Sequence, residues 1–102
     1  MGSKQFARSE VAMTTESIVM YTTRFCPFCR KARQLLFQKG WDYEGISVNG
    51  NPGKRDEMLK KSGRKTVPQT WIGLTHVGGY DELLTLDRSG ELDALVLGAS
   101  DE

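Results

Sequence analysis

A chain of 102 residues, of which 38% are hydrophobic and 26% charged, suits one globular domain with a modest core. Its formal net charge of +1 gives no overall indication of a nucleic-acid or membrane partner, and no apolar run approaches the ~20 residues that span a bilayer. The N-terminus lacks the apolar segment of a signal peptide, and two cysteines are too few for the disulfide framework of a small secreted protein. We therefore expect a cytoplasmic protein whose cysteines serve chemistry.

Residues 1–16 show neither the alternation of a strand nor the periodicity of a helix, and they begin with Met-Gly-Ser. We expect a disordered extension or a remnant of an expression tag, followed by one domain over residues 17–98 and a flexible tail over residues 99–102. An organelle-targeting peptide is the alternative. Glu10 and Glu16 argue against it, because such peptides are poor in acidic residues.

The first predicted strand and helix surround the first cysteine. Residues 17–23 are rich in β-branched and aromatic side chains, which is typical of a buried strand. Pro27 suits the first position of a helix, where its missing N–H costs nothing, and Gly40 is a natural helix stop. Apolar residues at three- and four-residue spacing predict the buried face of this helix: Phe28, Ala32, Leu35 and Leu36.

The rest of the chain predicts three more strands and three more helices. Asn51 and Pro52 suit a helix N-cap and first helical position. Two strands separated only by Gly73-Leu74 must form an antiparallel hairpin, whereas a helix between the first two strands implies that they run parallel. The expected strands cover residues 41–48, 66–72 and 75–77, and the expected helices cover residues 52–61, 80–88 and 91–97. The order β-α-β-α-β-β-α-α predicts an α/β fold.

Cys26-Pro27-Phe28-Cys29 lies at the junction of the first strand and helix, and a C-x-x-C pair beside a βαβ pattern is typical of a redox motif. Unpaired N–H groups and the macrodipole at a helix N-terminus stabilise a thiolate, which predicts that Cys26 is the attacking nucleophile. Cys29 lies one helical turn later and is predicted to be the resolving thiol. A zinc site would need two further Cys or His ligands, and His76 is the only candidate. Inert core cysteines are the other alternative.

Two further motifs accompany the cysteine pair, Thr66-Val67-Pro68 and Gly78-Gly79-Tyr80-Asp81. The three motifs together, in this order and spacing, resemble the glutaredoxin family, most closely the bacterial dithiol class often called glutaredoxin 3. The resemblance runs from about Ser17 to Leu97. It implies a thioredoxin fold, with a four-stranded mixed sheet flanked by helices, in which Pro68 follows a cis peptide bond and faces the cysteines.

For the binding site, the resemblance implies a groove for glutathione that ends at Cys26. The backbone of Val67 would pair with the cysteinyl residue of glutathione like an added strand, and N–H groups at the start of the third helix would bind the γ-glutamyl carboxylate. Asp81 would accept from the γ-glutamyl ammonium group, and its alternative role is a helix cap. Besides the catalytic Cys26 and Cys29, the expected glutathione-binding residues are Arg24, Phe28, Thr66, Val67, Pro68, Gly79, Tyr80 and Asp81.

Two positions depart from the family pattern. The usual lysine three residues before the first cysteine is Thr23 here, so the glycine-end carboxylate of glutathione would rely on Arg24, or on Arg64 and Lys65. The usual tyrosine between the cysteines is Phe28, which keeps the ring but lacks the hydroxyl group.

These expectations define a glutathione-dependent thiol–disulfide oxidoreductase, a monomer whose partners are glutathione and disulfide-containing or glutathionylated proteins. Two alternatives stay open: a redoxin that a thioredoxin reductase reduces, and a dimeric carrier of a [2Fe–2S] cluster held by Cys26 and glutathione. Pro27 argues against the carrier, because cluster carriers usually have Gly or Ser at that position. We expect no metal, nucleic-acid or membrane partner, and we expect structural roles for His76, Trp41 and Trp71.

Overall fold

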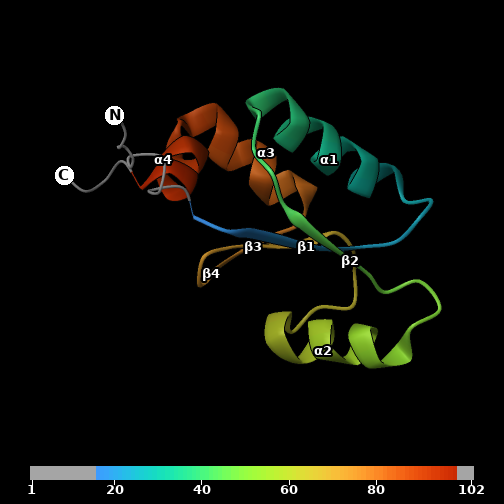
Figure 1. Ribbon diagram of the computed structural model, residues 1–102. Coiled ribbons are helices and arrows are strands. Elements are labelled where there is room, and N and C mark those ends of the chain that lie inside the picture. The colour runs from blue at the N-terminus through green and yellow to red at the C-terminus, as the bar shows by residue number, and fades with distance from the viewer. Residues whose placement is uncertain (1–15, 99–102) are drawn as a thin grey trace, which may run out of the picture.

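In the computed structural model, which describes residues 16–98, a four-stranded sheet lies between two layers of helices (Figure 1). The strands are β1 (Ile18–Thr22), β2 (Glu44–Ser47), β3 (Gln69–Ile72) and β4 (Thr75–Gly78), and the helices are α1 (Pro27–Lys39), α2 (Pro52–Ser62), α3 (Tyr80–Ser89) and α4 (Glu91–Leu97). This is the predicted order of elements. Residues 1–15 of the expected extension and the expected tail at residues 99–102 lie outside the described residues.

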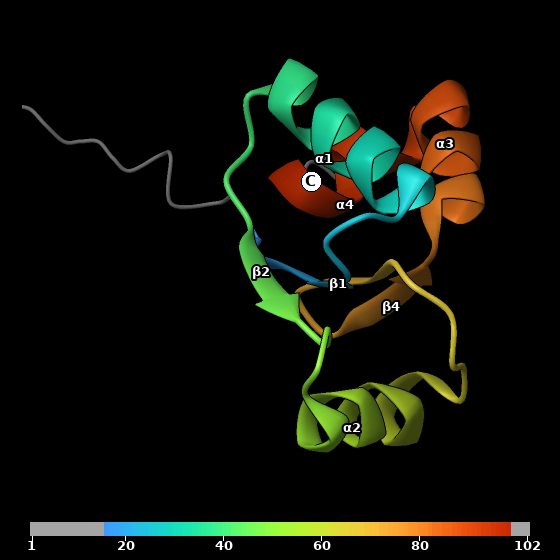
Figure 2. The ribbon, with the colours of Figure 1, turned by 90° about the vertical axis from the view of Figure 1, so that its right-hand side faces the viewer.

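The sheet has the strand order β2-β1-β3-β4, with β1 parallel to β2 and antiparallel to β3. β3 and β4 form the expected antiparallel hairpin, which turns at Gly73 with a positive φ of 58°. Figures 1 and 2 show α1, α3 and α4 on one face of the sheet and α2 alone on the other. A mixed sheet covered in this way has the thioredoxin fold, which confirms the predicted fold class.

The central strand β1 is covered on both faces, and its residues alternate between two hydrophobic clusters. Val19 and Tyr21 pack toward α2, where Met58 is fully buried. The larger cluster fills the space between the sheet and the other three helices and consists of Ile18, Met20, Ala32, Leu35, Leu36, Ile72, Val77, Leu83, Leu92 and Val96. A strand held on both faces is a rigid support for the loop that follows it, which leads to Cys26.

The ends of α1 and α2 carry the residues that the sequence predicts there. Pro27 is the first residue of α1, and Gly40 ends this helix in the left-handed conformation with a φ of 77°. Asn51 caps α2, since its side-chain oxygen accepts a hydrogen bond from the N–H of Lys54 at 3.2 Å. The start of α1 at Pro27 places Cys26 at the N-cap position.

Two strands, β2 and β3, each begin three residues later than predicted. β2 begins at Glu44 and not at residue 41, because the N–H of Trp41 donates to the carbonyl oxygen of Leu36 and completes the end of α1. β3 begins at Gln69 and not at residue 66, because Pro68 has no N–H to contribute to the ladder. Thr66-Val67 is consequently a loop outside the sheet.

The predicted buried face of α1 is confirmed for Ala32, Leu35 and Leu36 and is wrong for Phe28, whose side chain is 52% exposed. Cys29 occupies the inward position of the first turn, three residues before Ala32. Phe28 therefore lies outside the core, on the same surface as the first cysteine.

The adjacent residues Leu36 and Phe37 provide a matched test of this packing. Leu36 is fully buried in the larger cluster and Phe37 is 84% exposed on the same helix. We expect Leu36→Ala to lower the free energy of unfolding by about 2–5 kcal/mol, because it leaves a cavity. Phe37→Ala should change it by less than about 0.5 kcal/mol. Urea unfolding of both variants measures the difference, and equal losses would contradict the assignment of this helix face.

Candidate active site

The two cysteines differ in exposure because they occupy different positions at the start of α1. Cys26 is the N-cap residue, and its carbonyl oxygen accepts the first helical hydrogen bond, from the N–H of Arg30 at 3.1 Å. Its side chain is partly exposed, whereas that of Cys29 is fully buried. Burial raises the pKa of the Cys29 thiol, and its contact with Cys26 acts in the same direction. The geometry therefore leaves Cys26 as the accessible thiol, with Cys29 beneath it.

Beside Cys26 lies a groove of about 300 Å³. The thiol of Cys26 reaches one of its walls, with 3.8 Å between the sulfur and the carbonyl oxygen of Val67. The groove is lined by Phe28, Arg64, Thr66, Val67, Pro68, Gln69, Gly79, Tyr80, Asp81 and Glu82. Seven of the eight residues expected to bind glutathione are among them. The exception is Arg24, which is exposed and lies with its guanidinium carbon 5.8 Å from the centre of the Phe25 ring.

The walls of the groove come from two distant segments that approach each other closely. The bond between Val67 and Pro68 is cis, as the family resemblance implies. A Cβ atom on Gly79 would lie only 3.3 Å from the carbonyl oxygen of Pro68. Gly78 has a φ of 112°, and a Cβ atom there would lie 2.9 Å from a carboxylate oxygen of Glu82. Steric limits thus explain why both positions are glycine, since the pair lets α3 begin directly against the Pro68 loop.

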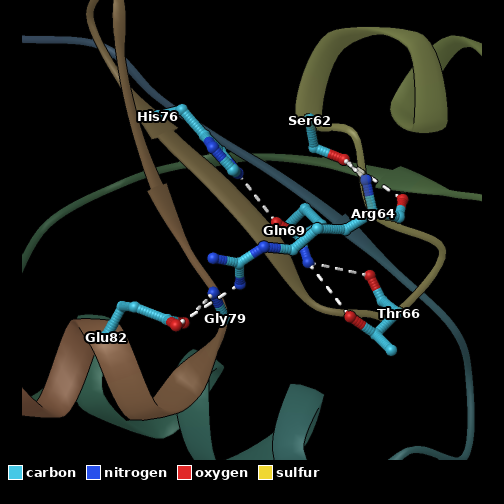
Figure 3. A network of polar contacts seen from close by, with 7 residues as sticks. All are labelled: Ser62, Arg64, Thr66, Gln69, His76, Gly79 and Glu82. Carbon is cyan, nitrogen blue, oxygen red and sulfur yellow. Dashed lines mark hydrogen bonds and ion pairs between the residues drawn. The ribbon is translucent and has the colours of Figure 1, made fainter.

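Glu82 closes the start of α3, a role that the sequence analysis offered to Asp81. Its Oε1 accepts a hydrogen bond from the N–H of Gly79 at 2.7 Å, and its Oε2 lies 3.3 Å from Nη1 of Arg64 (Figure 3). The Gly79 N–H, with help from the Arg64 guanidinium, lowers the pKa of the Glu82 carboxyl. Asp81 stays exposed at the groove, so its side chain is free of the capping role.

A buried amide links the Thr66 loop to β4. Gln69 is 1% exposed, and its Nε2 donates to both the carbonyl and the hydroxyl oxygen of Thr66, at 3.0 and 3.2 Å (Figure 3). Its Oε1 lies 2.8 Å from Nε2 of His76, and because an amide oxygen only accepts, the ring nitrogen donates. Burial, together with the positive charge of Arg64, lowers the pKa of His76. His76 lies in β4 and Trp71 in β3, with ring centroids 4.6 Å apart, so both have the expected structural surroundings.

Sequence reasoning missed Gln69 and Glu82 and named Arg64 only as an alternative to Arg24. The spacing Gly79-x-x-Glu82 is that of a capping box with glycine at the N-cap, which was a usable signal. No comparable signal exists for Gln69, because its partners, Thr66 and His76, are set by the hairpin register and by the path of the loop.

A second and larger pocket, of about 410 Å³, lies on the other side of Asp81 and Glu82. It is lined mainly by apolar parts of β4, α3 and α4, and neither cysteine contributes to it. Its size alone does not make it the active site, because it has no nucleophile. The groove beside Cys26 combines an accessible thiol, charged side chains and backbone groups outside the sheet, and it is the candidate active site.

In the described range, residues 16–98, no three His, Cys, Asp or Glu side chains come together in a way that could hold a metal ion. None of the helices in this range has the length and apolar character that crossing a bilayer requires.

Known proteins with similar sequences agree with this geometry. The sequence model of the family described as Glutaredoxin matches residues 18–77. A glutaredoxin from Pseudomonas aeruginosa is 53% identical over 79 residues, which make up 78% of this chain and 94% of the relative. Glutaredoxin 3 from Escherichia coli K12 is 45% identical over 80 residues, covering 78% of this chain and 96% of the relative.

Two solved structures extend the comparison. The solution structure of glutaredoxin from Brucella melitensis has a TM-score of 0.76 and 39% identity, covering 85% of this chain and 95% of that one. The crystal structure of a buckwheat glutaredoxin–glutathione complex has a TM-score of 0.73 and 26% identity, covering 79% of this chain and 76% of that one.

The unequal burial of the two thiols predicts unequal reactivity. With iodoacetamide at neutral pH, we expect Cys26 to be alkylated first and Cys29 to react only slowly, with more modification as the pH rises. Mass spectrometry of digests taken over time measures both rates. Cys29→Ser should leave the labelling of residue 26 in place. Modification of Cys29 at the same rate as Cys26 in the wild-type chain would contradict the assignment.

Proposed function

The chain belongs to the glutaredoxin family of thiol–disulfide oxidoreductases, and we propose that glutathione is its reductant and that it reduces protein disulfides and glutathionylated proteins. The observation that carries the proposal is the accessible Cys26 thiol, 3.8 Å from the Val67 carbonyl oxygen at the wall of a groove of about 300 Å³. The relative from buckwheat, crystallised as a glutaredoxin–glutathione complex, supports the same ligand.

The groove presents backbone groups that suit an extended peptide. Val67 precedes the first ladder residue of β3, so its N–H and carbonyl groups are available to the cysteinyl residue of glutathione. The first helical hydrogen bond of α3 runs from the N–H of Leu83 to the carbonyl oxygen of Gly79. The N–H groups of Tyr80 and Asp81 therefore have no partner within the helix and can bind the γ-glutamyl carboxylate.

With a glutathionylated protein, Cys26 alone performs the exchange. Its thiolate attacks the sulfur of the bound glutathione, which forms a Cys26–glutathione disulfide and releases the target cysteine as a thiolate. A second glutathione thiolate then attacks the glutathione sulfur of this mixed disulfide. The products are glutathione disulfide and the Cys26 thiolate, so one free glutathione is consumed and the glutathione that was attached to the target leaves as the other half of the disulfide.

With a protein disulfide, Cys29 is needed as well. Cys26 attacks one sulfur of the target and releases the other, and Cys29 then attacks the Cys26 sulfur and frees the reduced protein. Burial raises the pKa of Cys29, and negative charge on Cys26 raises it further, so the Cys29 thiol loses its proton more readily once Cys26 is held in the mixed disulfide. Two glutathione molecules reduce the resulting Cys26–Cys29 disulfide.

Replacing each cysteine separates the two routes. We expect Cys26→Ser to abolish both activities, and Cys29→Ser to lose protein-disulfide reduction while it retains deglutathionylation, because only the first route spares Cys29. Both are measured by coupling glutathione disulfide formation to NADPH oxidation through glutathione reductase. Retained deglutathionylation in Cys26→Ser would refute the assignment of the nucleophile.

Two further measurements separate the alternatives. Turnover with thioredoxin reductase and none with glutathione would replace the proposal by the redoxin alternative. Visible absorption of an anaerobically purified sample, lost on removal of glutathione, would favour the [2Fe–2S] carrier.

For the glycine-end carboxylate of glutathione, Arg64 is the cation that lines the groove, and Arg24 is not among its lining residues. We expect Arg64→Gln to raise KM for a glutathionylated substrate on the order of tenfold with kcat nearly unchanged, since a charge-assisted hydrogen bond to bound substrate is lost. Steady-state kinetics measures this. Arg55→Gln, an exposed cation on α2, is the control, and a larger effect of Arg24→Gln than of Arg64→Gln would contradict the choice of Arg64.

A further inference from the structure

Two exposed phenylalanines flank the reactive thiol. Phe25, directly before Cys26, is 83% exposed, and Phe28, two residues after it, is 52% exposed. Single exposed apolar residues are common on proteins, but two aromatic rings around a nucleophile form a patch at the place where a substrate must arrive. Phe28 also lines the groove, whereas Phe25 does not.

Cations surround these rings. The guanidinium carbon of Arg24 lies 5.8 Å from the centre of the Phe25 ring, and Nζ of Lys31 lies 5.6 Å from that of Phe28 and 5.8 Å from that of Tyr80. Arg30 is exposed on the same first turns of α1. We name Arg24, Phe25, Phe28, Arg30 and Lys31 the aromatic–cationic collar.

The positive charge of the collar is not neutralised by the surrounding sequence. From Ser17 to Trp41 the chain contains no Asp or Glu. Within residues 16–98, the cationic side chains that form ion pairs are Lys39, Lys54, Lys60 and Arg64, and none of them belongs to the collar. The collar is thus complementary to a partner that carries negative charge.

The collar meets the groove at Phe28, and its other four residues are absent from the groove lining. Arg24 and Phe25 precede the thiol and are absent from the groove lining, while the groove is formed by the Thr66 loop and the start of α3. A tripeptide bound along the groove would leave Arg24 and Phe25 uncovered. The protein part of a substrate, attached to the reacting sulfur, then has this surface to contact.

We propose that the collar is a docking surface for the target polypeptide, and that it selects segments whose reacting cysteine is flanked by an apolar and an acidic residue. This deepens the proposed function and rests on it. The apolar residue packs on Phe25, which is already held by Arg24, and the acidic residue pairs with Arg24, Arg30 or Lys31. This selection acts on the target polypeptide, because glutathione itself binds in the groove.

The test compares matched glutathionylated peptides that differ only next to the cysteine: Leu with Asp, Leu with Lys, and Ser with Asp. The wild-type chain should have its highest kcat/KM with Leu and Asp, by about tenfold over either other peptide, and the Asp-to-Lys difference should shrink as ionic strength rises. The mixed disulfide of glutathione with β-mercaptoethanol serves as a substrate without flanking residues.

Phe25→Ser isolates the apolar contact. It should remove the preference for Leu over Ser and leave kcat/KM for the small mixed disulfide unchanged, because Phe25 lies outside the groove. Phe37→Ser is the matched control, since Phe37 is equally exposed, at 84%, near the other end of α1. This control should keep every preference.

Arg24→Glu and Arg30→Glu isolate the charge. Each should reduce or invert the ratio of kcat/KM between the Asp and Lys peptides, and because the ratio is taken on one variant, any effect on glutathione binding cancels. Arg55→Glu on α2, across the sheet from α1, should leave the ratio unchanged.

Several results would overturn the proposal. The first is an equal kcat/KM of the wild-type chain for all three peptides. The second is a loss of kcat/KM in Phe25→Ser that is as large for the small mixed disulfide as for the peptides. The third is the same loss of kcat/KM in Phe37→Ser. A dimer in sedimentation that Phe25→Ser converts to monomer, with peptide selectivity unchanged, would assign the collar to a second copy of the chain instead. Absence of turnover with glutathione on every substrate would refute the proposed function itself, which distinguishes the two failures.

Discussion

The close approach of the Pro68 loop to the start of α3 is the constraint on which the rest of the site depends. A Cβ atom on Gly79 would lie 3.3 Å from the Pro68 carbonyl oxygen, and Gly78 adopts a φ of 112° that other residues rarely take. A side chain at residue 79 would press on the Pro68 loop, so glycine allows the helix N-terminus and the loop to approach closely and to line one groove. Cys26 reaches this groove from a third segment, at the end of the central strand.

The polar groups around the groove form hydrogen bonds and an ion pair with one another. These contacts make the walls of the groove rigid, which favours binding. Gln69, almost fully buried, uses its amide to hold Thr66 on one side and His76 on the other. Glu82 holds the N–H of Gly79 and the guanidinium of Arg64 at once. Since a buried amide is costly when unpaired, the Gln69 contacts favour a single arrangement of the loop before any ligand arrives.

Helix α1 divides the chemistry between its faces. Its inner face buries Cys29 with the core, which leaves Cys26 as the more accessible thiol. Its first turns also present Phe28, Arg30 and Lys31 outward, in a stretch of sequence with no acidic residue. One short helix therefore carries the accessible thiol at its N-cap, the buried thiol in its first turn and part of the aromatic–cationic collar. Under the two proposals, the groove binds glutathione and the collar contacts the target protein.

The sequence by itself determined the order of elements, the helix ends at Pro27, Gly40 and Asn51, and the thiol pair, because these depend on local preferences of proline, glycine and capping residues. Three short motifs also indicated the family and seven groove residues. The local sequence also held unused signals for the start of β3 after Pro68, which has no N–H, and for Glu82 at the start of α3, which has capping-box spacing from Gly79. Only the tertiary structure decided that Phe28 faces outward. The Gln69 contacts with Thr66 and His76 belong to the same group, because they depend on loop path and hairpin register, which no local pattern encodes.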